Sequence, residues 1–298
     1  MINAADTAAP LLEVNRLTVD IDVDGEIRHI LNGVSFTLKA GEALGLVGES
    51  GSGKSMTVKA IDRLLPRGAR QGGSIRFRGR DIATFKGSEA RRYCSEVAMV
   101  FQDPRVAINP VRKIGDFMTE AIVTNGGVSR REANRRAVDM LARLRIPDGA
   151  RRLEQYPHEL SGGLLQRVMI ASTLLTEPKL LLADEPTTAL DVSTQAEIML
   201  ILNDLRRDLG LAVIFITHDL ELAGAICDGL AVMYAGEIVE QGPHVYEAPR
   251  HPYTVELMAA RPDIERRVKR LPVLTYNLER HRALTAGVPA AAGEEQRR

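Results

Sequence analysis

Residues 48–55 have the composition and spacing to bind the phosphates of a nucleotide. They match G-x-x-x-x-G-K-[ST], in which glycines let successive backbone N–H groups point at phosphate oxygens. Lys54 adds a cation for the β and γ phosphates, and the Ser55 hydroxyl can bind Mg²⁺. A helix beginning here directs its positive dipole end at the same anion. We therefore predict a site for ATP and Mg²⁺ that comprises Gly48, Glu49, Ser50, Gly51, Ser52, Gly53, Lys54, Ser55 and Met56.

Two acidic residues follow an apolar run further along the chain. Residues 180–183 (LLLA) read as a buried strand, and Asp184 and Glu185 stand at its end. Such acids can simply be solvated carboxylates in a turn, but the phosphate loop favours a role in catalysis. Asp184 is then the partner of Ser55 in binding Mg²⁺, and Glu185 is the general base that activates water against the γ phosphate.

Three further elements could contact the same nucleotide. Gln102 ends an apolar strand, where its amide could reach Mg²⁺ and the attacking water, and His218 ends another, where its ring could contact the γ phosphate. Leu160, Ser161, Gly162 and Gly163 open a helix and expose backbone N–H groups. Taken singly, these are equally well a strand-end amide, a structural histidine and a helix N-cap.

The elements that position these residues alternate between strands and helices. Strands are expected at 11–22 and 26–38, around an Asp24-Gly25 turn, and at 43–47, 74–77, 96–101, 179–184, 211–217 and 230–234. A helix is expected at 54–65, and 104–157 reads as helical, with a capping box at Ser129–Glu132. The predicted fold is α/β: a P-loop NTPase core with a mixed, largely parallel sheet, an antiparallel β subdomain and an inserted α-helical subdomain.

Composition narrows the function classes. The 298-residue chain has 39 Lys and Arg against 39 Asp and Glu, and this balance argues against a dedicated nucleic-acid binder. The N-terminal residues lack the features of a signal peptide, and no run reaches the roughly 18–20 apolar residues of a membrane span. Cys94 and Cys227 are predicted to be buried free thiols in a reducing cytoplasm.

The order of the motifs resembles that of the ATP-binding cassette (ABC) ATPases, over about residues 11–245. Phosphate loop, Gln102, the Leu160–Gly163 signature, the acidic strand, Asp191 in the D-loop and His218 follow one another in that order. The resemblance implies that the signature caps the ATP held by a second subunit, so that two ATPs lie between two cassettes. It implies a cassette at 1–245 with the helical insert at about 104–157, and a C-terminal extension at 246–298 that is disordered from about 287.

Several segments are similar to one branch of that family, the ATPase subunits of dipeptide, oligopeptide and nickel importers. They are Gln102-Asp-Pro104, Asn109-Pro110, and residues 187–192 (TTALDV), 227–228 (CD), 232–236 (VMYAG) and 251–254 (HPYT). The likeness extends to about residue 274. It implies a heterodimer with a second ATPase, two transmembrane permeases contacted by the helical insert, and an extracytoplasmic solute-binding protein. The chain would lie on the cytoplasmic face of the inner membrane.

The sequence departs from the family pattern at three places. Ile21 stands near the position where an aromatic ring should stack on adenine, and Leu164 replaces the usual Gln or Met after the signature. No cysteine follows Cys227, so no iron–sulfur role is expected for the tail.

Two alternatives within the family stay open, an exporter motor and a soluble ABC ATPase of DNA repair or the ribosome. The gap of 59 residues (161 − 102) between Gln102 and Ser161 is too short for the coiled coil of the repair forms, and the chain holds one cassette rather than two. A P-loop kinase would have no reason to carry the signature or His218.

Overall fold

The computed structural model describes residues 9–186 and 192–260, and the chain divides into the units Met1–Tyr246 and Glu247–Arg298. The described part of the second unit contains helix α10 (Pro252–Ala259), which His251 caps by accepting a hydrogen bond from Tyr253 N. None of the described helices has the length and apolar character needed to cross a bilayer. The predictions for Asp191, for residues 187–190 and for the tail beyond 260 lie outside the described residues.

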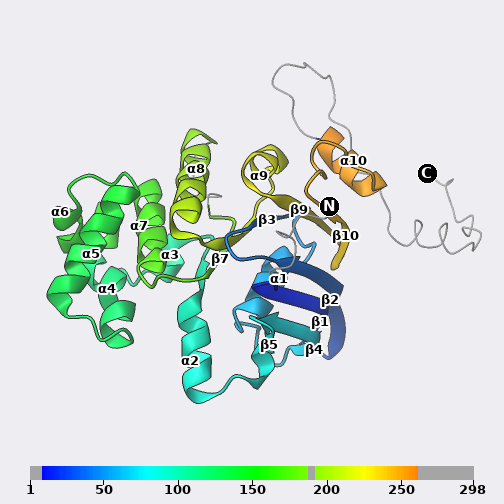
Figure 1. Ribbon diagram of the computed structural model, residues 1–298, viewed down its shortest axis with the longest axis horizontal. Coiled ribbons are helices and arrows are strands. Elements are labelled where there is room, and N and C mark those ends of the chain that lie inside the picture. Colours follow the sequence, from blue (N-terminus) through cyan, green and yellow to red (C-terminus); the bar gives the residue numbers. More distant parts are fainter. Residues whose placement is uncertain (1–8, 187–191, 261–298) are drawn as a thin grey trace, which may run out of the picture. The chain divides into compact units, whose positions relative to one another are not determined.

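A six-stranded sheet forms the centre of the first unit (Figure 1). Its order is β10-β9-β3-β8-β7-β6, with parallel pairing from β9 to β6 and antiparallel pairing between β9 and β10. The α/β fold class is therefore confirmed. The strands are β3 (Ala43–Val47), β6 (Val97–Val100), β7 (Leu180–Asp184), β8 (Ala212–Ile216), β9 (Gly229–Tyr234) and β10 (Glu237–Gly242).

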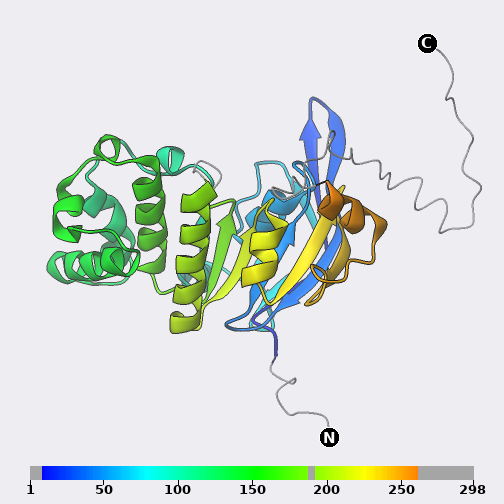
Figure 2. The same ribbon diagram turned by 90° about the horizontal axis from the view of Figure 1, so that it is seen from above.

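Alternate residues of the central strands enter two different hydrophobic clusters. Leu181 and Ala183 of β7 pack in the cluster that includes α7 (Gly162–Leu174), α8 (Val192–Leu209) and Ile226 of α9 (Leu220–Ile226). Leu180 and Leu182 pack in the second cluster, with α1 (Lys54–Ile61) and the antiparallel strands. Both faces of the sheet are thus covered (Figure 2), which explains why its strands read as continuous apolar runs.

A second, antiparallel sheet has the order β2-β1-β4-β5. It contains β1 (Leu12–Val23), β2 (Glu26–Leu38), β4 (Arg70–Phe77) and β5 (Arg80–Asp81). The predicted hairpin is confirmed, since Val23 pairs with Glu26 around Asp24 and Gly25.

Helices make up most of residues 104–174. They are α3 (Pro104–Ala107), α4 (Ile114–Thr124), α5 (Arg130–Arg143), α6 (Gly149–Glu154), the 3₁₀ turn η2 (Pro157–Glu159) and α7. Ser129 caps α5 by accepting a hydrogen bond from Glu132 N at 3.3 Å. The Glu132 carboxylate accepts hydrogen bonds from Arg135 and Arg136 on the exposed face and thus takes part in the salt bridges along α5.

Two elements and one cysteine differ from the sequence-based expectation. Helix α2 (Gly87–Glu96), preceded by the 3₁₀ turn η1 (Ile82–Thr84), fills a region that was expected to hold only strands and turns. Tyr93 is the residue that α2 buries, and Cys94, one position further round the helix, is exposed. The prediction of a buried Cys94 is therefore wrong, whereas Cys227 is partly buried, and burial raises the pKa of its thiol to about 12.

Asp62, at the C-terminal end of α1, is partly buried. Tyr93, whose hydroxyl donates to Ile61 O at 2.5 Å, packs edge-on against Phe77 close by. Burial raises the pKa of Asp62 to about 7. A carboxyl whose pKa rises on folding destabilises the fold when it ionises. Its contribution to stability is therefore lost as pH rises from its unfolded pKa, near 4, through 7.

Asp62→Asn should make the free energy of unfolding less sensitive to pH. The difference in free energy of unfolding, variant minus wild type, should be larger at pH 8 than at pH 4 by on the order of 2–4 kcal/mol. The reason is that only the wild type must bury an ionised carboxylate at pH 8. Urea unfolding at both pH values measures the difference. Asp204→Asn, an exposed change on α8, serves as the control and should show the same difference at both pH values. A pH-independent effect of Asp62→Asn would contradict the assignment.

Candidate functional site

The residues predicted to bind nucleotide gather at the carboxyl ends of four adjacent parallel strands. The phosphate loop follows β3, Asp184 ends β7, and Gln102 and His218 lie just beyond β6 and β8. Because the order is β3-β8-β7-β6, all four ends lie along one edge of the sheet. Ligands of open α/β sheets bind at such edges.

The phosphate loop surrounds the Lys54 ammonium. Lys54 Nζ donates to Gly48 O at 2.8 Å, to Glu49 O at 2.7 Å and, more weakly, to Ser52 Oγ at 3.4 Å. Gly48 has to be glycine, because a Cβ atom there would lie 2.2 Å from Met233 O. Residues 49–51 are exposed, whereas Ser52 and Lys54 are buried.

This arrangement leaves Lys54 able to bind a phosphate. An ammonium has three protons, and two of them bind backbone carbonyls that fix the side chain inside the loop. The third is the weakly held one and is the proton that a phosphate oxygen can accept. Burial lowers the pKa of Lys54, while the neighbouring Glu185, Asp184 and Glu49 oppose that shift.

Ser55 and Asp184 form a pair of hard oxygen ligands. Ser55 Oγ donates to Asp184 Oδ1 at 2.9 Å. Burial raises the pKa of Asp184, and the hydrogen bond from Ser55 acts against that rise. A hydroxyl and a carboxylate at this separation fit Mg²⁺, which usually takes one or two protein oxygens and completes its shell with phosphate and water. No set of three or more His, Cys, Asp or Glu side chains suited to a metal occurs in the part of the chain that the structure describes.

Gln102 and Glu185 form a second pair beside the first. Gln102 Nε2 donates to Glu185 Oε2 at 2.9 Å, which leaves the Gln102 carbonyl oxygen for a cation or water. Glu185 has φ of 45°, a left-handed conformation that is costly for a residue with a side chain. Its N–H donates to Ile216 O of β8 at 3.1 Å, so the sheet itself holds the backbone in this conformation.

Other predicted residues lie apart from these pairs. Among the described residues, no hydrogen bond joins Ser161 or His218 to the phosphate loop; His218 is exposed. Ser161 caps α7, where its Oγ accepts from Leu164 N at 3.4 Å, and Leu160 is buried. Ile21 pairs with Arg28 across the β1–β2 hairpin and packs against the core.

A hollow of about 440 Å³ beside the two pairs is a feature that the motifs did not predict. Gln102 and Asp184 line it together with Lys59, Met99, Phe101, Asp103, Val106 and Ala107. Phe101 and Val106 are exposed, as is Val111 nearby in the sequence. The sequence signal was the presence of apolar side chains, Val106 and Val111 among them, in the segment that follows Gln102.

Comparison with known proteins matches this site to one family. The family model described as ABC transporter matches residues 31–188. The oligopeptide transport ATP-binding protein OppD of Salmonella typhimurium is 46% identical over 88% of this chain and 79% of its own length. The Haemophilus influenzae OppD protein is 42% identical over 94% of this chain and 88% of its own length.

Solved structures give the same fold. CbiO1 from Clostridium perfringens, part of the transporter complex CbiONQ, superposes with a TM-score of 0.69 and 30% identity, over 81% of this chain and 92% of its own. The ATP-binding cassette MJ0796 was solved as a dimer with ADP and Pi in a post-hydrolysis state. It superposes with a TM-score of 0.69 and 27% identity, over 78% of this chain and 97% of its own.

Proposed function

The chain belongs to the ABC transporter family and is an ATPase, and on that premise we propose that it drives a peptide importer. The observation that carries this proposal is identity above 40% to OppD proteins over nearly the whole described chain, joined to an assembled set of hydrolytic side chains at the sheet edge. Peptide is the proposed cargo class because the relatives compared above are named for it. Nickel, the other cargo that the sequence suggested, has no such support.

We assign the roles as follows. Lys54 and the loop N–H groups bind the β and γ phosphates, and Ser55, Asp184 and Gln102 bind Mg²⁺, which would neutralise charge on those phosphates. Glu185 accepts the proton of the attacking water. Gln102, already hydrogen-bonded to Glu185, holds that water in line. His218, at the end of β8, contacts the γ phosphate.

The site is proposed to be completed by a second ATPase. The first N–H groups of α7, at Gly162 and Gly163, have no acceptor within the helix, and together with Ser161 they form an anion site. That site would bind the γ phosphate held by the partner. A heterodimer of this kind would sit on the cytoplasmic face of the membrane with two permeases and a solute-binding protein.

Exposed apolar side chains indicate where a permease docks. Val106 is 85% exposed, Val111 79% and Phe101 41%, all on or next to α3 at the start of the helical segment. Apolar groups clustered on a surface usually mark a contact with another protein. Since Phe101 and Val106 also line the hollow that contains Gln102 and Asp184, a permease segment seated there would touch the residues that control hydrolysis.

Glu185→Gln tests the proposed function. The variant should bind ATP with wild-type affinity, because no phosphate contact is lost, while kcat falls by about 10²–10⁴ because the base is gone. With MgATP it should accumulate a closed pair with the second ATPase, measured by size-exclusion chromatography of the assembled transporter.

Glu89→Gln, which removes an exposed acid far along the chain from the site, is the matched control and should hydrolyse ATP normally. If Glu185→Gln hydrolysed ATP at the wild-type rate, Glu185 would not be the general base. Absence of any ATP-dependent pairing would contradict the shared site.

Ser55→Ala should raise the requirement for Mg²⁺. Loss of the hydroxyl leaves Asp184 without its hydrogen bond and removes one metal ligand, so half-saturation should need at least about 10-fold more Mg²⁺. Steady-state ATPase rates against free Mg²⁺ measure the shift. Ser88→Ala, an exposed change on α2, should leave the curve in place. Overlapping curves for wild type and Ser55→Ala would exclude the hydroxyl as a ligand.

Val106→Asp should weaken assembly with the permeases and leave the isolated ATPase intact. A charge buried without a partner in an apolar contact costs enough to lower affinity by at least about 10-fold. Co-purification with the permeases and ATP affinity of the free chain are the two measurements. Leu200→Asp on α8, where Leu200 is 53% exposed, controls for the added charge. Equal losses in both variants would show that the Val106 surface is not specific.

A further inference from the structure

The β9–β10 turn is hydrogen-bonded directly to the phosphate loop. Gly236 N donates to Ser52 O at 3.0 Å, and Ser52 is only 4% exposed. Ser52 directly precedes Gly53 and Lys54, where the loop passes into α1. The position of this turn therefore sets the orientation of the last peptide units of the loop, whose N–H groups face a bound phosphate.

Asn32 of β2 holds that turn with two hydrogen bonds. Asn32 N donates to Gly236 O at 2.8 Å, and the side-chain Nδ2 donates to Ala235 O at 3.0 Å, across 203 residues of sequence. A continuous path of hydrogen bonds thus runs from β2 through the turn to the phosphate loop.

The turn needs this external support because its own conformation is unfavourable. Ala235 has φ of 47°, in the left-handed region, although it carries a side chain. Gly236, with φ of 81°, fits tightly, since a Cβ atom there would lie 2.5 Å from Ile30 O and 2.9 Å from Asn32 Nδ2. Strained backbone persists only where surrounding interactions fix it.

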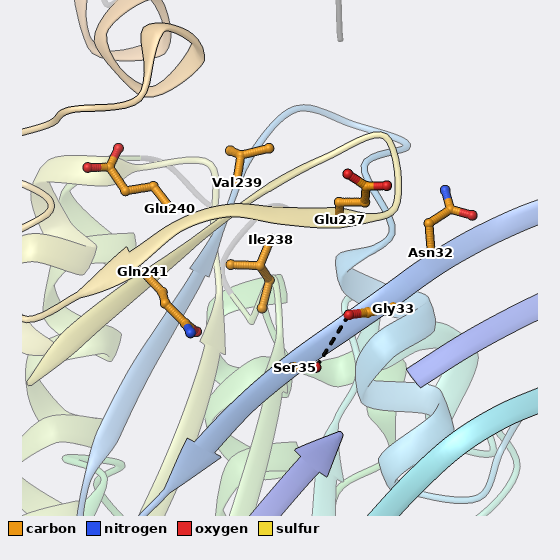
Figure 3. Close-up of a pocket in the computed structure, with 8 residues that line it drawn as sticks. All are labelled: Asn32, Gly33, Ser35, Glu237, Ile238, Val239, Glu240 and Gln241. Atoms are coloured by element: carbon orange, nitrogen blue, oxygen red, sulfur yellow. Dashed lines mark hydrogen bonds between the residues drawn. The ribbon is translucent and has the colours of Figure 1, made fainter. Parts of the chain in front are cut away.

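The support from Asn32 comes from the exposed side of the turn. Asn32 is exposed and lies at one end of an open groove of about 490 Å³ between β2 and β10, which Gly33, Ser35 and residues 237–241 also line (Figure 3). The two strands are the facing edges of different sheets. At this end of the groove, the Asn32 amide links β2 directly to the β9–β10 turn.

We propose that Asn32 is a positioning residue for nucleotide binding: its amide fixes the Ala235–Gly236 turn and, through Gly236 N, the phosphate-binding conformation of the loop at Ser52. This inference rests on the proposed function, since it assumes that the loop binds ATP. Asparagine suits the position because Nδ2 donates to a carbonyl. Aspartate has the same shape but would set a second acceptor against Ala235 O.

Calorimetric titration of the purified full-length chain tests the proposal, with MgATP, MgADP and magnesium tripolyphosphate as ligands. Asn32→Asp and Asn32→Ala should raise the Kd of all three by a similar factor, about 5–10-fold, the size expected when one neutral hydrogen bond is lost. The factor should be shared because the loop contacts only phosphates. Asn32→Gln, which retains the amide donor on a longer side chain, should recover part of the affinity.

Thr37→Ala, an exposed change on the same strand, is the control and should bind all three ligands as the wild type does. In the assembled transporter, Asn32→Asp should raise KM for ATP and leave kcat at saturating ATP unchanged. A lower melting temperature with unchanged Kd values would assign Asn32 a structural role alone and overturn the proposal, as would a loss of kcat at constant KM. A wild-type chain that bound no ATP would instead contradict the proposed function.

Discussion

The site depends on the parallel pairing of β3, β8, β7 and β6. The registers place Leu46 and Asp184 opposite the same residue, Ile216, and Val100 opposite Ala183, so the strands end level with one another. Residues far apart in the sequence then meet without long side chains. Ser55 and Asp184 bond across 129 residues, and Gln102 and Glu185 across 83. A slip of one position in any of these pairs would move a strand end and turn its side chains to the other face.

The opposite end of β3 is fixed by a polar network around the buried Arg206. Arg206, 5% exposed, donates to Gly41 O and to Asp228 Oδ2, and the same carboxylate oxygen accepts from Ala43 N. A guanidinium can be buried in this way because carbonyl and carboxylate oxygens accept its protons. Strand β3 is thus anchored at its beginning, and its other end leads into the phosphate loop.

Much of this arrangement was predictable, because the responsible signals are local. Apolar runs of strand length identified β3, β7 and β8, and the glycine spacing at 48–55 located the loop. Helix α2 was missed because its composition is polar and it buries only Tyr93. The pairing of Gln102 with Glu185, and the support that Asn32 gives to the loop, are contacts between distant segments that neither periodicity nor motif spacing encodes. Cys94 shows the same limit, since the sequence does not say which face of a helix a residue occupies.

Hydrogen-bonding capacity supports the proposal that a second cassette completes the site. Within the cassette, Lys54 donates two hydrogen bonds to loop carbonyls, Asp184 accepts from Ser55, and Glu185 accepts from Gln102. Polar groups are therefore already positioned on one side of the expected nucleotide. The signature offers complementary donors: the Ser161 hydroxyl oxygen accepts from Leu164 N, and the N–H groups of Gly162 and Gly163, in the first turn of α7, have no acceptor within the helix. Among the described residues, no hydrogen bond joins Ser161 to the phosphate loop of its own chain, so we propose that this helix start binds a phosphate held by another chain. The proposed pairing of two cassettes therefore follows from hydrogen-bonding capacity as well as from family resemblance.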